Sequence, residues 1–91
     1  KNLKIYCYCL FDRSGNFRGV YSSANAVHRD ALKLCNKGGG KVVIEGAQGD
    51  SPVEASATAL RNILKGAFDV QVIYTSGHAY RAHIIKTKLK E

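Results

Sequence analysis

The chain has 91 residues, with 14 Lys and Arg against seven Asp and Glu, so its formal net charge is +7. This length suits one domain, residues 1–91, whose folding buries roughly 60 to 65% of the unfolded chain's surface, and it excludes a second domain. A hydrophobic content of 45% with 23% charged residues argues against a disordered chain, and the excess of basic residues favours a polyanionic partner.

The first predicted element is a strand over residues 3–11. Its alternation places Cys7 and Cys9 on one face and Tyr6 and Tyr8 on the other. Because both faces carry apolar or amphipathic side chains, we expect a central strand, with helices over one face and a partly open, aromatic surface on the other. In this interpretation the cysteines lie in the core, and the tyrosines either stack on unpaired bases or pack across strands.

A hairpin and a helix are predicted next. Residues 12–16 form the turn, where Gly15 adopts a positive φ, and residues 17–22 return as a second strand with a bulge or a close backbone contact at Gly19. Ser22 or Ser23 then caps a helix that the glycines from Gly38 onward end. The buried stripe of this helix consists of Ala24, Val27, Ala31, Leu34 and Cys35.

The second half of the chain predicts a short buried strand over residues 41–45 and a second helix over residues 51–65. Ser51 is the expected N-cap, Pro52 occupies the first helical position, and Glu54 completes the capping box. Residues 68–75 and 80–88 predict a terminal hairpin with a turn at residues 76–79. The order ββαβαββ indicates an α+β fold with two helices and one mostly antiparallel sheet of about five strands. The long closing strand, at an open edge of the sheet, also predicts self-association as a homodimer.

The three cysteines bear on the cellular compartment. Cys7 and Cys9 lie two residues apart on one strand face and diverge too far for an easy disulfide, and Cys35 makes the number odd. Reduced thiols predict an intracellular protein, cytoplasmic or nuclear. No apolar run approaches the roughly 18 residues of a membrane span, and residues 1–4 lack the apolar core of a secretory signal, so we expect no membrane partner. Because the first residue is Lys and not Met, we expect an upstream segment.

A nucleic-acid surface is the main functional prediction, because Lys and Arg neutralise phosphates while Tyr and His side chains reach into a groove. Basic residues are frequent in the second predicted helix and in the terminal hairpin, which together form the expected surface. We therefore expect a non-catalytic, regulatory or accessory module that favours duplex DNA over RNA. The predicted contacts are Arg61, Lys65, Arg81, Lys86 and Lys88, with Tyr80 and His78 near a groove and Arg13 and Arg18 as a second region.

A protein-interaction module is the first alternative. Such a module, for instance an inhibitor, would dock its basic face on an acidic surface of a partner protein. The scattered His, Cys and carboxylate residues have no spacing typical of a metal site, and no cofactor or catalytic residue is predicted.

A third possible function comes from a resemblance to a family of nucleases. Lys4-Ile5-Tyr6 and Gly19-Val20-Tyr21 together resemble the start of GIY-YIG endonuclease domains, which implies a catalytic surface that includes Tyr6, Tyr21 and Arg29. Lys4 stands where that family has its first glycine, and no glycine follows the second tyrosine. The resemblance therefore implies a degenerate relative that binds DNA without cutting it.

Overall fold

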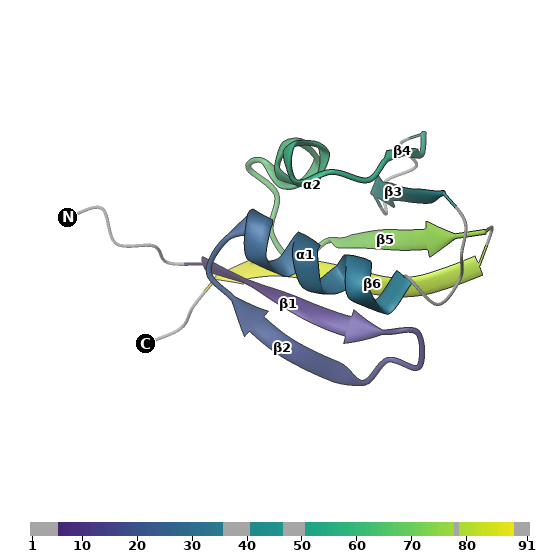
Figure 1. The fold of residues 1–91 in the computed structure, drawn as a ribbon. Coiled ribbons are helices and arrows are strands. Elements are labelled where there is room, and N and C mark those ends of the chain that lie inside the picture. Colours follow the sequence, from purple (N-terminus) through teal and green to yellow (C-terminus); the bar gives the residue numbers. More distant parts are fainter. Residues whose placement is uncertain (1–5, 36–40, 47–50, 78, 89–91) are drawn as a thin grey trace.

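The computed structural model describes residues 6–35, 41–46, 51–77 and 79–88 of the chain. Within these residues it contains six strands and two helices (Figure 1). In chain order they are β1 (Tyr6–Asp12), β2 (Phe17–Tyr21), α1 (Ala24–Cys35), β3 (Val42–Gly46), β4 (Val53–Glu54), α2 (Ala57–Leu64), β5 (Gln71–Ser76) and β6 (Ala79–Lys88). The predicted α+β class is confirmed, with the two-residue strand β4 added to the five expected strands.

The strands form one antiparallel sheet in the order β2-β1-β6-β5-β3-β4. Two expectations about strand position are wrong. β1 has neighbours on both sides, but β6 and β5 occupy the centre of the sheet. The closing strand β6 is therefore no edge, and the edges are β2 and β4. The long β6 pairs along β1 over seven residues, which buries more backbone hydrogen bonds than a terminal hairpin alone would.

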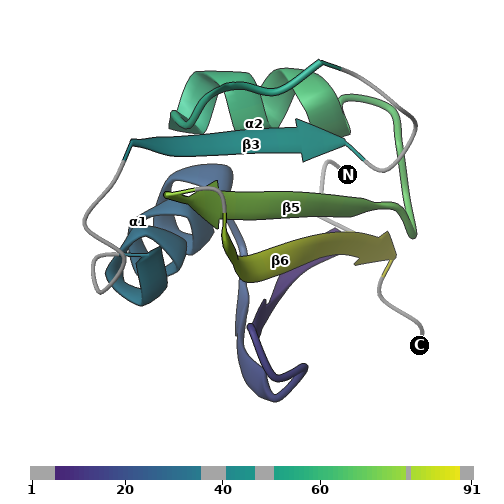
Figure 2. The same cartoon turned by 90° about the vertical axis from the view of Figure 1, so that its right-hand side faces the viewer.

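Both helices cover the same face of the sheet, and β3, β5 and β6 lie in front of them in the view of Figure 2. α1 contacts β1, β2, β5 and β6, whereas α2 contacts β3 and β5. The core lies between the two layers. Its largest fully buried side chains are Tyr74, Leu10, Ile44, Leu60, Leu64 and Ile84. No described helix lies on the opposite face, which we call the open face.

The two faces of β1 are interchanged relative to the sequence interpretation. Tyr8 and Leu10 are buried beneath the helices, whereas Cys7, Cys9 and Phe11 alternate onto the open face, where Cys7 is still buried and Cys9 is partly exposed. Alternation alone tells which residues share a face, but not which face the helices cover. Here the ring of Tyr8 fills the space under the helices, and it packs edge-to-face on Tyr6 with ring centroids 5.9 Å apart. Of the two alternatives predicted for the tyrosines, the structure therefore supports packing for Tyr8 and excludes base stacking.

The start of the second helix is also wrong in the sequence interpretation. Val53 and Glu54, expected in its first turn, pair with β3 as β4, and the Ala55 N–H donates to the Val42 carbonyl at 3.1 Å. The helix begins at Ala57, and the Ser56 side chain accepts from the Ala59 N–H at 3.0 Å. The residues around Ser51 fit a capping box, but an extended segment there also satisfies the free backbone groups at the edge of β3.

This difference gives a direct test. Replacing Ser56 with Ala should lower the free energy of unfolding by about 1 kcal/mol, because the first turn of α2 loses its N-cap. Ser51→Ala removes the same hydroxyl from an exposed position outside the helix, and it should change stability by less than about 0.5 kcal/mol. Urea unfolding of both variants compares the two positions. A larger loss of stability for Ser51→Ala than for Ser56→Ala would mean that the helix begins at Ser51, as the sequence predicts.

Candidate functional site

A pocket lies where the β1–β2 turn, the second half of α1 and the start of β6 meet. Its volume is about 300 Å³. Four basic side chains line it, one each from the turn, β2, α1 and β6, and Asp12 and Leu34 complete the wall. We call the set Arg13, Arg18, Lys33 and Arg81 the cationic pocket.

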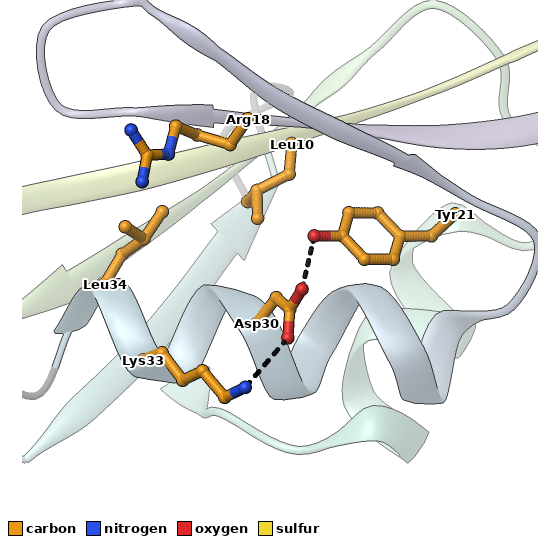
Figure 3. A pocket seen from close by; sticks show the side chains of 6 residues that line it. All are labelled: Leu10, Arg18, Tyr21, Asp30, Lys33 and Leu34. Atoms are coloured by element: carbon orange, nitrogen blue, oxygen red, sulfur yellow. Dashed lines mark hydrogen bonds and ion pairs between the residues drawn. The ribbon is translucent and has the colours of Figure 1, made fainter.

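A smaller cavity of about 160 Å³ shares Arg18, Lys33 and Leu34 with this pocket and extends towards Leu10 (Figure 3). Tyr21 and Asp30 also line it. Across the two cavities, four cationic groups face two carboxylates, so the lining carries a net charge of +2.

The turn between β1 and β2 holds one side of the pocket. Asp12 accepts from the Ser14 and Asn16 N–H groups, both at 2.9 Å, and the Gly15 N–H donates to the Asp12 carbonyl at 2.9 Å. Gly15 has φ of 84°, as the sequence predicts for this turn. The hydrogen bond from the Asn16 backbone is the main reason why the pKa of Asp12 is lowered. Asp12 therefore remains ionised, orders the turn and lies 3.8 Å from Arg18.

The α1 side of the pocket is fixed by an ionised carboxylate. Tyr21 Oη donates to Asp30 Oδ2 at 2.5 Å, and Lys33 Nζ lies 3.5 Å from Asp30 Oδ1 (Figure 3). The hydrogen bond from Tyr21 lowers the pKa of Asp30 most, and Lys33 lowers it further. Gly19 leaves room for this arrangement, because an added Cβ there would lie 3.2 Å from Tyr21 Oη. Of the two alternatives predicted at Gly19, the register shift between β1 and β2 beside it agrees with the bulge, whereas its close neighbour is the side chain of Tyr21 and not another backbone.

Arg81 enters the pocket from an irregularity in β6. Tyr74 pairs with Ala82 and Thr75 with Tyr80, which leaves Arg81 as the extra residue of a bulge. The Nε atom of Arg81 is buried and has no hydrogen-bond partner among the described residues. Bulges redirect a side chain locally, and this one brings Arg81 into the pocket wall.

The structure brings together three of the sequence-predicted contacts, Arg13, Arg18 and Arg81. Lys33 completes the pocket and was not predicted, because a lysine in the last turn of a helix is typical of an ordinary solvent-exposed position. The sequence does place Lys33 three residues after Asp30, a spacing that allows an ion pair on one face of a helix and so holds the lysine side chain in place.

Arg61 and Lys65 lie apart from this pocket. Both are on the exposed side of α2 or at its end, and Arg61 donates to Asn25 Oδ1, near the start of α1, at 3.0 Å. Lys88 is at the opposite end of β6 from Arg81, with its Nζ 5.0 Å from the centroid of Phe68. The predicted contacts therefore do not all converge, because Arg81 lies at the other end of β6 from Lys88.

Lys86 is buried, with 7% of its surface exposed, and its Nζ donates to the Leu64 carbonyl at 3.1 Å. Since this ammonium lies inside the domain, we remove Lys86 from the set of phosphate contacts. Phe68 precedes β5 instead of belonging to it, contrary to the predicted strand, and it packs against Lys86. Tyr80 is exposed on the open face, and His78 lies outside the described residues.

Comparisons with protein-family models, curated proteins and solved structures found no match to this chain. In the part of the chain that the structure describes, no three His, Cys, Asp or Glu side chains are grouped so that they could hold a metal ion. Neither described helix is long and apolar enough to cross a membrane. Of the residues that the GIY-YIG resemblance implies, Tyr21 is bonded to Asp30, Tyr6 packs on Phe68, and Arg29 is exposed on α1.

Proposed function

We propose that this chain is a non-catalytic nucleic-acid-binding module that holds the phosphate backbone in its cationic pocket, in a regulatory or accessory intracellular role. The observation that carries the proposal is the convergence of four basic side chains, from the first hairpin, α1 and β6, on one cavity. A formal net charge of +7 would add long-range attraction for a polyanion.

The chemistry of the lining suits a phosphate group. Arginine guanidinium groups donate two parallel hydrogen bonds to phosphate oxygens, and a lysine ammonium adds a point charge. The side chains of Arg18 and Lys33 are both more than half exposed, so an incoming phosphate can reach them. Asp12 and Asp30 orient the basic groups but leave a positive balance, which favours an anion over a cation in this cavity.

The test compares two pairs of neutralised charges. Arg18→Gln with Lys33→Gln removes opposite walls of the pocket, and Arg61→Gln with Lys65→Gln removes the same charge from α2. We expect the pocket pair to weaken binding of a labelled oligonucleotide by about tenfold or more and to reduce the slope of log K against log salt by about 1 to 2. The α2 pair should weaken binding by less than about threefold, through long-range electrostatics alone.

Fluorescence anisotropy at two salt concentrations, with duplex DNA and single-stranded DNA, measures these effects, and circular dichroism checks that each variant folds. An equal loss for the α2 pair would mean that Arg61 and Lys65 also contact the nucleic acid, as the sequence predicts, and would contradict a binding site confined to the cationic pocket. No salt-dependent binding to either oligonucleotide would contradict the proposed function and favour an acidic protein partner.

A further inference from the structure

The open face of the sheet carries exposed aromatic and apolar side chains next to the cationic pocket. Phe17 and Val20 on β2 are 57% and 58% exposed, and Tyr80 on β6 is also exposed. Exposed large apolar side chains grouped on one face of a small domain are typical of an interaction surface. We call the four rings of Phe17, Phe11, His83 and Tyr80, which come from three neighbouring strands, the aromatic strip.

The rings of the strip are in contact with one another from edge to centre of the sheet. The Phe17 and Phe11 centroids are 5.7 Å apart, and Phe11 stacks on His83 at 4.8 Å with an interplanar angle of 11°. Tyr80 lies next, with its ring 6.1 Å from His83 and nearly parallel to it. Burial lowers the pKa of His83, so at neutral pH its ring is an uncharged member of the strip.

The hydroxyl of Tyr80 and one ring nitrogen of His83 are used within the domain. Tyr80 Oη and His83 Nδ1 are hydrogen-bonded to each other, and Tyr80 Oη also lies 3.4 Å from the Asp12 carbonyl oxygen. The strip therefore presents ring surfaces instead of groups that read base edges. Such a surface suits base stacking, which every base accepts, more than it suits the reading of a sequence.

The strip and the cationic pocket lie at the same end of the sheet, on opposite faces. Phe17 and Arg18 are consecutive on β2, and Tyr80 and Arg81 are consecutive on β6, with the aromatic member on the open face and the basic member lining the pocket. Because β2 is an edge strand, no described strand lies outside it at the boundary between the two faces. A polymer with flat rings and charged linkers could pass around this edge and contact both.

We propose that the aromatic strip stacks unpaired bases of a single-stranded nucleic acid whose phosphates occupy the cationic pocket. This inference rests on the proposed function and narrows it from nucleic acid in general to single strands. In a duplex the faces of the bases are already stacked on their neighbours, so a strip of rings gains nothing from them. A second copy of this chain is the poorer occupant, because it would bring another charge of +7 to the same edge.

The experiment uses Phe17→Ala, since this side chain is more than half exposed and its truncation spares the core. Stacking on one aromatic side chain changes affinity by roughly 5- to 150-fold per base, so we expect Phe17→Ala to weaken binding of oligo(dT) by at least about fivefold. Tyr80→Ala is a second variant with the same expectation. Binding of a duplex of equal length should change by less than about twofold, because its bases do not reach the strip.

Val20→Ala is the matched control. Val20 lies on the same face of the same strand and is equally exposed, but it has no ring, so its truncation should leave oligo(dT) affinity within about twofold of the original. An oligo(U) of equal length should bind within about threefold of oligo(dT), because stacking uses the base faces, which both oligonucleotides offer, and not the ribose 2′-hydroxyl.

The outcomes separate this inference from the proposed function. If the pocket pair weakens binding but Phe17→Ala and Tyr80→Ala do not, the strip has no role in binding and the proposed function stands. If no oligonucleotide binds at low salt, both proposals fail together. An equal effect of Val20→Ala or a concentration-dependent dimer that Phe17→Ala dissociates would each overturn stacking of unpaired bases.

Discussion

Leu10→Ala is expected to lower the free energy of unfolding by about 2 to 5 kcal/mol, the usual cost of removing a fully buried leucine side chain. Leu10 is 1% exposed, belongs to the core cluster beneath the helices, and forms the inner end of the smaller cavity next to the pocket. Its truncation removes apolar contacts and leaves a void that the surrounding side chains fill only in part. Urea unfolding at neutral pH measures the loss.

Cys9→Ala is the control for this prediction. Cys9 is the preceding residue on the same strand, but it points to the open face and is only partly buried, so its truncation should cost less than about 1 kcal/mol. The comparison tests which face of β1 the helices cover. A larger loss for Cys9→Ala than for Leu10→Ala would mean that the cysteine face is the core, as the sequence analysis expects.

Local patterns predict the elements of this fold well when one signal dominates. The stripe from Ala24 to Cys35 predicts α1, and the Ala26 N–H donates to Ser23 Oγ at 3.2 Å, at one of the two expected caps. The second helix is different, because Ser51 and Ser56 both have good capping chemistry. The choice between them depends on whether β3 recruits residues 53–54, and capping chemistry at the two serines does not report this pairing with the preceding strand.

The candidate site also depends on strand pairing that local sequence patterns do not predict. Net charge predicts a basic surface, and it correctly includes Arg13, Arg18 and Arg81 among its candidates. Their convergence depends on strand order, because β6 inserts between β1 and β5 and so brings Arg81 beside the first hairpin. A closing strand at the edge, as expected from the sequence, would have left Arg81 with α2 and the terminal hairpin.

Lys86→Ala is the second large effect that we expect, a loss of about 2 to 4 kcal/mol in the free energy of unfolding. Lys86 is the one predicted phosphate contact that the structure places inside the domain. Its Nζ donates to the carbonyl of Leu64, the last residue of α2, and lies 4.4 Å from the ring centroid of Tyr6 and 4.9 Å from that of Phe68. A cation near the C-terminus of a helix also interacts favourably with its terminal carbonyl groups.

Two further variants separate the contributions of this side chain. Lys86→Met keeps most of the aliphatic stem and removes the ammonium, so it should cost about 1 to 2 kcal/mol, the hydrogen bond and the interactions with the two rings. The Leu64 carbonyl also accepts from the Ala67 N–H at 3.1 Å, which limits the penalty for the oxygen that remains. Lys88→Ala, at an exposed position on the same strand, should cost less than about 0.5 kcal/mol.

Measurements of stability and of oligonucleotide binding together distinguish a structural role of Lys86 from a phosphate contact. If the ammonium of Lys86 only stabilises the C-terminal end of α2, Lys86→Met should lower the free energy of unfolding. The affinity for oligo(dT) should then stay within about twofold of the original, because the cationic pocket is at the other end of β6. A phosphate contact gives the reverse result, with unchanged stability, weaker binding and a shallower salt dependence. The position of this lysine in the sequence, between two other basic residues of a terminal strand, is the same in both cases, so only its burial distinguishes a structural cation from a binding one.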